Sequence, residues 1–207
     1  MNQFETELFP WIDIPEEIAP ILWRQAKMRN MTIPEHARNY GCSGNKESTR
    51  QHFEGLLGEY GFSVISKLPI DWAIYNGRGD KGADFGSIEV KTVVAYGGPL
   101  PEFKMKLAKL NEKKKTARAI VLCRAPKDYS RVQVLAGMSM KRFLECGFRK
   151  NHRALVGKTP NWVNHTAEFD LRLSSEERRE KGQMTALTPD NIDRFVELYY
   201  HPKEIII

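Results

Sequence analysis

Cysteine is scarce in this 207-residue sequence, and its three cysteines lie far apart, at Cys42, Cys123 and Cys146. A disulfide framework needs paired cysteines, and a zinc knuckle needs closely spaced ligands such as C-x-x-C. The sequence offers neither pattern. We therefore expect three packed, free thiols.

Long apolar runs are also missing, and no stretch approaches the roughly 20 residues that a membrane-spanning helix needs. The first residues, Met-Asn-Gln-Phe-Glu-Thr-Glu, lack the basic and apolar regions of a signal peptide. These two absences argue against an integral membrane protein and against a secreted one. We expect a cytoplasmic protein.

The composition is that of a folded protein, with 41% hydrophobic and 28% charged residues. Its length suits one domain with a hydrophobic core, or one domain with a helical extension. Lys and Arg number 32 against 26 Asp and Glu, so the formal net charge is +6. A basic surface favours polyanionic partners such as nucleic acid, although a solvated surface without a partner is the alternative.

Residues 1–44 are predicted to form a helical N-terminal extension, and residues 45–207 the main domain. In the extension, Pro15 and the two glutamates after it suit the first turn of a helix. A second short helix is expected over residues 34–41. The main domain opens with Ser48-Thr-Arg-Gln51, which has the pattern of a capping box and begins a helix that Gly61 is expected to end.

The segments that follow predict a mixture of strands and helices. Strands are expected at residues 62–66, 72–75, 88–94, 119–123 and 131–136. Helices are expected in part of 104–118, over 140–146, and from Thr188 to Tyr199 with Pro202 as its end. Residues 149–182 are polar and irregular in pattern. A helix followed by several strands indicates an α/β fold.

One short segment, residues 84–91, has the pattern of a β-hairpin. Gly86 and Ser87 supply a two-residue turn whose first position tolerates positive φ. This register pairs Phe85 with Ile88 on one face, and the residues on either side of that pair then meet on the other face.

Those outer residues are Asp84 and Glu89, whose Cβ atoms should be about 4.5–5.5 Å apart if they are directly opposed. Side chains alternate along a strand, so Lys91 lies on the same face as Glu89. Two carboxylates so close repel each other unless a cation lies between them, and a hard divalent ion with oxygen ligands fits this role. Such an ion can activate water and stabilise charge on a phosphodiester. On a solvated strand, Glu89 and Lys91 would instead simply face water.

These residues resemble the PD-(D/E)XK nuclease superfamily, which includes many restriction enzymes: Asp84 is followed by Glu89-Val90-Lys91. The resemblance covers roughly residues 48–140. It implies a restriction-endonuclease-like core, in which a central mixed β-sheet is flanked by helices. It also implies a hydrolase, most simply an endonuclease, that cleaves DNA with Mg²⁺ or Mn²⁺.

The resemblance further implies roles for single residues. Asp84, Glu89 and Lys91 would be catalytic, and the two carboxylates would bind metal with the backbone carbonyl of Val90. Many members carry a metal-reaching glutamate on the first helix, for which Glu54 is the first candidate and Glu47 and Glu59 are the others.

The sequence departs from the family pattern in two places. Ala83 stands where a proline is usual, and only four residues separate Asp84 from Glu89. The short separation leaves Asp80 as an alternative first acid.

A basic stretch after the motif is the candidate surface for DNA phosphates. Its predicted contacts are Lys104, Lys106, Lys113, Lys114, Lys115 and Arg118. The alternatives to a DNA nuclease are a nuclease directed at RNA, and a nucleic-acid-binding or assembly protein that keeps the fold without catalysis. Whether two chains pair as a homodimer is open.

Overall fold

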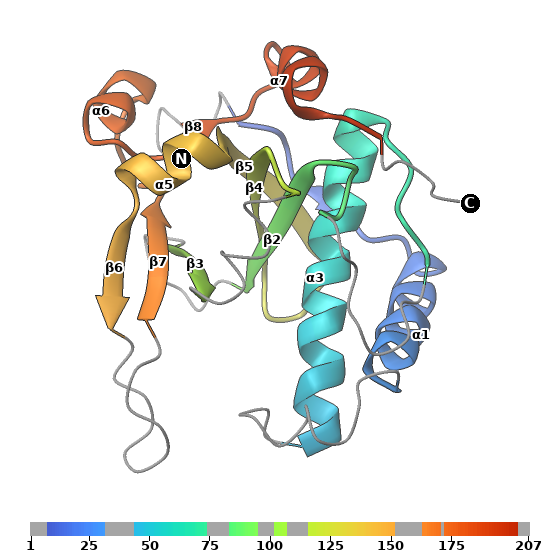
Figure 1. Ribbon diagram of the computed structural model, residues 1–207. Helices are drawn as coiled ribbons and strands as arrows, with labels where there is room; N and C mark the ends of the chain where they lie inside the picture. Colours follow the sequence, from blue (N-terminus) through green and yellow to red (C-terminus); the bar gives the residue numbers. More distant parts are fainter. Residues whose placement is uncertain are drawn as a thin grey trace.

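The computed structural model describes residues 8–31, 44–73, 83–94, 102–106, 116–151, 163–170 and 172–202. Side chains are described for these residues except 44–48, 102–106, 148–151 and 163–166. The elements, shown in Figure 1, follow in the order β1 (Ile12–Asp13), α1 (Ile18–Met31), α3 (Gly44–Ser66), β2 (Ile88–Val94), β3 (Glu102–Lys106), β4 (Ala119–Ala125), β5 (Arg131–Ser139), α5 (Met140–Cys146), β6 (Phe148–Asn151), β7 (Val163–Glu168), α6 (Ser175–Glu180), β8 (Thr185–Ala186) and α7 (Ile192–Tyr199).

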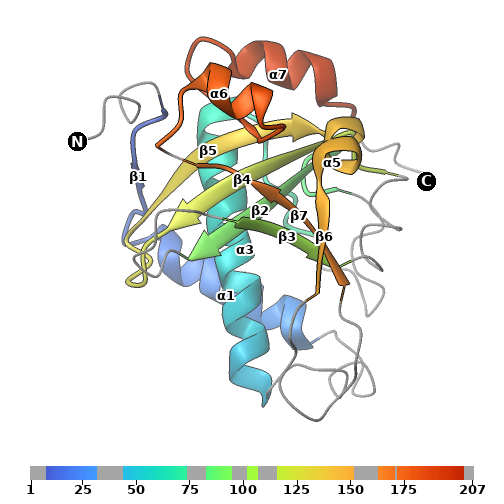
Figure 2. The same cartoon turned by 90° about the vertical axis from the view of Figure 1, so that its left-hand side faces the viewer.

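The main sheet has the order β1-β5-β4-β2, with β8 added against β5. Strands β2 and β4 run parallel, whereas β5 runs antiparallel to β4, β1 and β8. The predicted α/β fold with a mixed central sheet packed against helices is therefore confirmed. A second, antiparallel sheet has the order β3-β7-β6, and Figure 2 shows it beside the main sheet.

The two faces of the main sheet bury different cores. In β4, Val121 and Cys123 pack in a cluster with Phe62 of α3 and with α7, whereas Ile120 and Leu122 pack in a cluster with α5 and with Ala167 of β7. Since side chains alternate along a strand, the α3 side of the sheet and the β7 side are opposite faces. Figure 1 shows α3 and the second sheet on opposite sides of β2.

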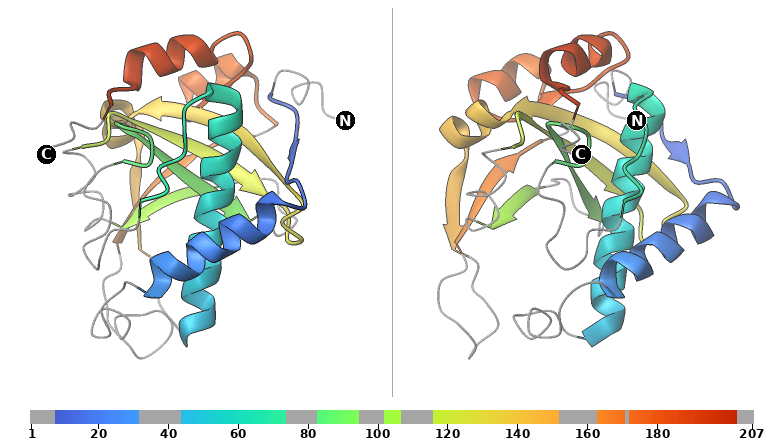
Figure 3. Two further views of the ribbon diagram at one scale, coloured as in Figure 1. Left: turned by 90° about the vertical axis from the view of Figure 1, so that its right-hand side faces the viewer. Right: turned by 45° about the vertical axis from the view of Figure 1, so that its right-hand side comes forward.

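Helix α1 packs on α3 rather than on the sheet. Leu22 and Ala26 are fully buried against α3, where Leu56 and Leu57 belong to the same apolar cluster. In Figure 3, α1 crosses α3 on the side away from the sheet. The predicted helix of the N-terminal segment therefore exists, and it shares its core with the main domain.

Helix α3 extends beyond both of its predicted ends. It begins at Gly44 instead of at the capping-box pattern, and it continues through Gly61 to Ser66. A Cβ atom at Gly61 would lie 2.7 Å from Val132 Cγ1, so this glycine serves close packing of the helix on β5 instead of ending the helix. The strand predicted at residues 62–66 is therefore wrong. Lys67, with φ 59°, takes the left-handed conformation that ends the helix.

Strands β2, β4 and β5 and helix α5 confirm the predictions for those segments, although β4 and β5 are longer than predicted. Two other predictions are wrong. Residues 72–73 of the predicted strand 72–75 are not a strand, and α7 begins at Ile192 because Asn191 Oδ1 accepts from Thr188 N in a preceding turn. Of the segment 104–118, predicted to be helical in part, residues 104–106 belong to strand β3, and residues 107–115 lie outside the described residues. Strands β6 and β7 and helix α6 lie in or overlap residues 149–182, for which the polar and irregular sequence pattern predicted no element.

None of the helices in the described ranges is both long enough and apolar enough to cross a membrane.

Candidate active site

The centre of the candidate site is the turn that leads into β2. Phe85 and Ile88 exchange two backbone hydrogen bonds, with N···O distances of 2.9 and 2.7 Å. Gly86, between them, has φ +56°, as the first position of a type II′ turn requires. The predicted Gly86-Ser87 turn and the Phe85–Ile88 pairing are confirmed. The pairing is an isolated bridge, and Asp84 lies in a bend before it instead of in a strand.

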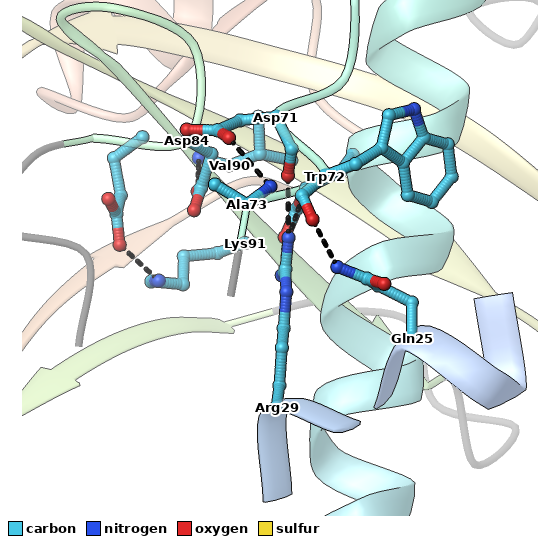
Figure 4. Close-up of polar contacts among 10 residues, drawn as sticks. Gln25, Arg29, Asp71, Trp72, Ala73, Asp84, Val90 and Lys91 are labelled. Carbon is cyan, nitrogen blue, oxygen red and sulfur yellow. Dashed lines mark hydrogen bonds and ion pairs between the residues drawn. The ribbon is translucent and has the colours of Figure 1, made fainter. Parts of the chain in front are cut away.

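Asp84 contacts β2 through its side chain. Its Oδ2 accepts a hydrogen bond of 2.7 Å from the backbone N–H of Val90. The N–H and C=O groups of a strand residue point to the same edge, so the Val90 carbonyl faces the edge on which Asp84 lies. Figure 4 shows Asp84 beside Val90 and Lys91.

Glu89 and Lys91 lie on the opposite side of β2 from α3. Glu89 pairs in register with Ile120 and Lys91 with Leu122, and both partners belong to the core cluster on the β7 side. The Glu89 side chain is only 1% exposed and forms an ion pair with Lys91, whose side chain is 34% exposed. A buried carboxylate is costly unless it is paired. Lys91 therefore stabilises the Glu89 carboxylate, and its own side chain extends from this buried group to the solvent.

The turn is held by the C-terminal segment of the chain. The buried Ser87 hydroxyl donates to the carbonyl of Tyr199 and accepts from the backbone N–H of His201 at 3.1 Å. Any Cβ atom at Gly86 would overlap the carbonyl oxygen of His201. The loop between the two carboxylates is thus fixed by residues more than 100 positions later in the sequence.

Cys123 is a buried thiol whose pKa is affected by the charge of Asp84. Burial raises the pKa of its thiol far above the usual range, and the negative charge of Asp84 adds to this effect. The structure places this buried cysteine in β4 beside Thr92 of β2. The prediction of a packed, free thiol is therefore confirmed for Cys123, whereas it is wrong for Cys146, which is free but exposed. Cys42 lies outside the described residues.

The structure does not bring Glu54 to the other predicted ligands. Its carboxylate accepts from the Tyr129 hydroxyl at 2.9 Å and pairs with Arg50 at 3.4 Å. Glu54 lies on α3, and α3 covers the face of the sheet opposite to Glu89. The described structure therefore does not group Glu54 with Asp84 and Glu89, and its role as a metal ligand stays a prediction.

Of the other two glutamates proposed for that role, only Glu59 has a described side chain. Glu59 is held by both terminal nitrogens of Arg29, at 2.8 and 3.2 Å. The side chain of Glu47 is outside the described residues, as is Asp80.

Asp71 and its neighbours, which sequence reasoning missed, join α1 to the segment after α3. Arg29 donates to the carbonyl of Asp71 at 3.0 Å, and Gln25 donates to that of Trp72 at 2.6 Å. Figure 4 shows this network beside Asp84 and Val90. No local sequence pattern indicates it, because it joins residues 42 and 47 positions apart.

The predicted phosphate contacts lie in three different settings. Lys104 and Lys106 are in strand β3, which pairs with β7. Lys113, Lys114 and Lys115 lie outside the described residues. Arg118 is exposed at the start of β4, and its backbone N–H donates to the Ser87 carbonyl at 2.7 Å.

The donor set at β2 suits a hard divalent cation. Asp84 and Glu89 offer carboxylate oxygens, and Val90 offers a carbonyl at the same edge as Asp84. Across the described ranges, no three His, Cys, Asp or Glu side chains are grouped to hold a metal ion. A cation here would rely on two carboxylates, a carbonyl and water, which is common for Mg²⁺.

Comparison of the chain with protein-family models, with curated proteins and with solved structures gave no match. The functional interpretation therefore rests on the residues and their geometry.

Proposed function

We propose that this protein is a metal-dependent nuclease that hydrolyses DNA phosphodiester bonds, most simply as an endonuclease. One observation carries the proposal: at the start of strand β2, Asp84 accepts a hydrogen bond from the Val90 N–H, and Glu89 forms an ion pair with Lys91. This is the set that phosphodiester hydrolysis needs, with oxygen ligands for a cation and an adjacent ammonium.

In this proposal Asp84 and Glu89 hold Mg²⁺ or Mn²⁺ with the Val90 carbonyl. The cation would supply Lewis acidity and a positive charge for the phosphodiester. Asp84 suits this role because an ionised carboxylate has about four lone-pair sites, and its Oδ2 accepts from Val90 N–H at the edge of β2. That hydrogen bond also fixes the orientation of the carboxylate at the edge of β2.

Lys91 has three N–H donors. It can therefore hold Glu89 and still donate to the attacking water or to a phosphate oxygen. Its partial exposure places the ammonium between the buried carboxylate and solvent, where a substrate phosphate arrives. The burial of Glu89 lowers the local dielectric and strengthens these charge interactions.

The order of the elements supports a restriction-endonuclease-like core. Helix α3 precedes β2, β2 carries Glu89 and Lys91, and β4 and β5 complete a mixed sheet. This agrees with a helix followed by a mixed sheet that carries the acidic pair and the lysine. The net charge of +6 supports a polyanionic substrate.

The test is cleavage of supercoiled plasmid and linear duplex DNA with Mg²⁺, Mn²⁺ or chelator. The variants are Asp84→Asn, Glu89→Gln and Lys91→Met. Glu145→Gln is the matched control, because it makes the same chemical change as Glu89→Gln on the exposed face of α5. Circular dichroism checks that each variant is folded.

Wild type and Glu145→Gln should cut only with metal, and the three site variants should lose at least about 100-fold in rate. Unchanged cleavage in any folded site variant would contradict the assignment. DNA binding that is indifferent to metal, without cleavage by wild type, would instead favour the non-catalytic binding protein. In that protein Lys91 would serve only to neutralise Glu89.

A further inference from the structure

Arg118 and His201 form an exposed pair beside the turn that separates Asp84 from Glu89. Arg118 Nη1 lies 2.7 Å from His201 Nε2. Both side chains are exposed. Within the described residues this is the one side-chain contact that the Arg118 guanidinium makes, and neither group has a carboxylate partner.

The chemistry of the contact determines what the pair can offer to a third group. A guanidinium carries five N–H donors and no acceptor, so the imidazole Nε2 must be the acceptor and the ring proton must lie on Nδ1. The only acceptor of the pair is thereby used. What remains is N–H donors together with the positive charge of Arg118, and this combination suits the oxygens of an anion.

The backbone fixes this pair in place. Arg118 N–H donates to the carbonyl of Ser87, and His201 N–H donates to the Ser87 hydroxyl. Ile88 and Ala119 are directly paired. Strand spacing then puts the Cα atom of Arg118 about 8 Å from that of Glu89. Donors held this way need little reorganisation when a ligand binds.

We propose that Arg118 and His201 together bind a phosphate of the DNA backbone next to the phosphate that is cleaved, which makes His201 a substrate-binding residue. This inference rests on the proposed nuclease function. It assigns the end of the C-terminal segment two tasks, which are to hold the turn through its backbone and to hold substrate through the imidazole.

The test is binding of a fluorescein-labelled duplex oligonucleotide, measured by anisotropy in chelator so that cleavage does not interfere. The variants are Arg118→Ala, His201→Ala and the double variant. Alanine at 201 keeps the backbone contacts of His201 with Ser87. Arg194→Ala, on the exposed face of α7, controls for the loss of one positive charge.

Each single variant should weaken binding about three- to tenfold, and Arg118→Ala should lower the slope of log affinity against log salt by about one. The double variant should lose less than the product of the two single losses, because both side chains hold one phosphate. Arg194→Ala should bind like wild type.

Wild-type affinity in His201→Ala, or losses that simply multiply in the double variant, would overturn the shared phosphate site. If cleavage by wild type is metal-dependent while these binding results are negative, only this inference fails. If wild type binds no DNA and also cuts none with metal, both proposals fail.

Discussion

The packing of α3 on β2 gives a sharp prediction, because β2 carries Glu89 and Lys91. A Cβ atom added at Gly58 would overlap Thr92 Oγ1 and would lie 3.3 Å from Cys123 Cβ. Three positions earlier on the same helix, a Cβ atom at Gly55 would meet nothing within 4 Å. The same Gly→Ala change should therefore have opposite effects at the two positions.

The magnitudes follow from two opposing terms. Replacing Gly by Ala within a helix stabilises it by about 0.8–1.0 kcal/mol. Overpacking of a tight interface costs about 1–3 kcal/mol. Gly55→Ala should thus raise the free energy of unfolding by about 0.8–1.0 kcal/mol, and Gly58→Ala should lower it by up to about 2 kcal/mol.

The assay is urea unfolding followed by circular dichroism at 222 nm, with the slope of the transition compared between variants. Thr92→Ala in the Gly58→Ala background should recover part of the loss. The Thr92 hydroxyl is buried and makes no hydrogen bond within the described part of the chain, so its removal forfeits none. Equal stabilisation by both glycine substitutions would refute the close approach of α3 to β2.

Three further predictions concern the site and its surroundings. Gly86→Ala should lower the free energy of unfolding by about 1–3 kcal/mol in urea titrations, since it forces φ +56° on a residue with a side chain and overlaps a backbone oxygen; an unaffected variant would contradict the turn. Lys91→Ala should lower it by about 2–3 kcal/mol because the buried Glu89 carboxylate loses this ion pair, and Lys91→Ala with Glu89→Gln should recover part of this loss, so a double variant no more stable than Lys91→Ala would argue against the pair. The hydrogen bond from Arg172 holds the pKa of Asp170 below its ordinary value, so Asp170 should contribute about 1 kcal/mol that is present above pH 5 and lost as pH falls through its folded pKa; a stability difference between wild type and Asp170→Asn that persists at pH 2 would refute this contribution.

Local patterns predicted several elements because their causes are local. Strand β4 is a run of apolar residues buried on both faces, and α5 has Ser139 as an N-cap whose side chain accepts from Arg142 N. The hairpin turn at Gly86-Ser87 could be predicted for the same reason, since a two-residue turn determines which flanking residues pair. Phe85 and Ile88 pair as that turn requires.

Other features depend on contacts between distant parts of the chain. Gly61 has the appearance of a helix end, yet it lies inside α3 because Val132 of β5 packs against it. The segment after it is apolar enough to suit a strand, and burial of Phe62 on the sheet keeps it helical. Propensity alone cannot separate these outcomes, because tertiary packing overrides it.

The candidate site also combines features that follow from local sequence with features that depend on distant contacts. Asp84, Glu89 and Lys91 lie within eight residues, and their local register could be predicted. The support from Ser87 to His201 spans 114 positions, and no periodicity indicates such a contact. The position of Glu54 relative to the other candidates could not be predicted for a related reason, because it depends on which face of the sheet α3 covers.

The most direct test of the central claim, that Asp84 and Glu89 together hold one divalent cation, is calorimetric titration of the folded protein with Mn²⁺. Wild type and Glu145→Gln should bind one ion, and Asp84→Asn and Glu89→Gln should each lose measurable binding. Mn²⁺ binding of equal affinity in all four proteins would contradict the claim, and so would its absence from wild type.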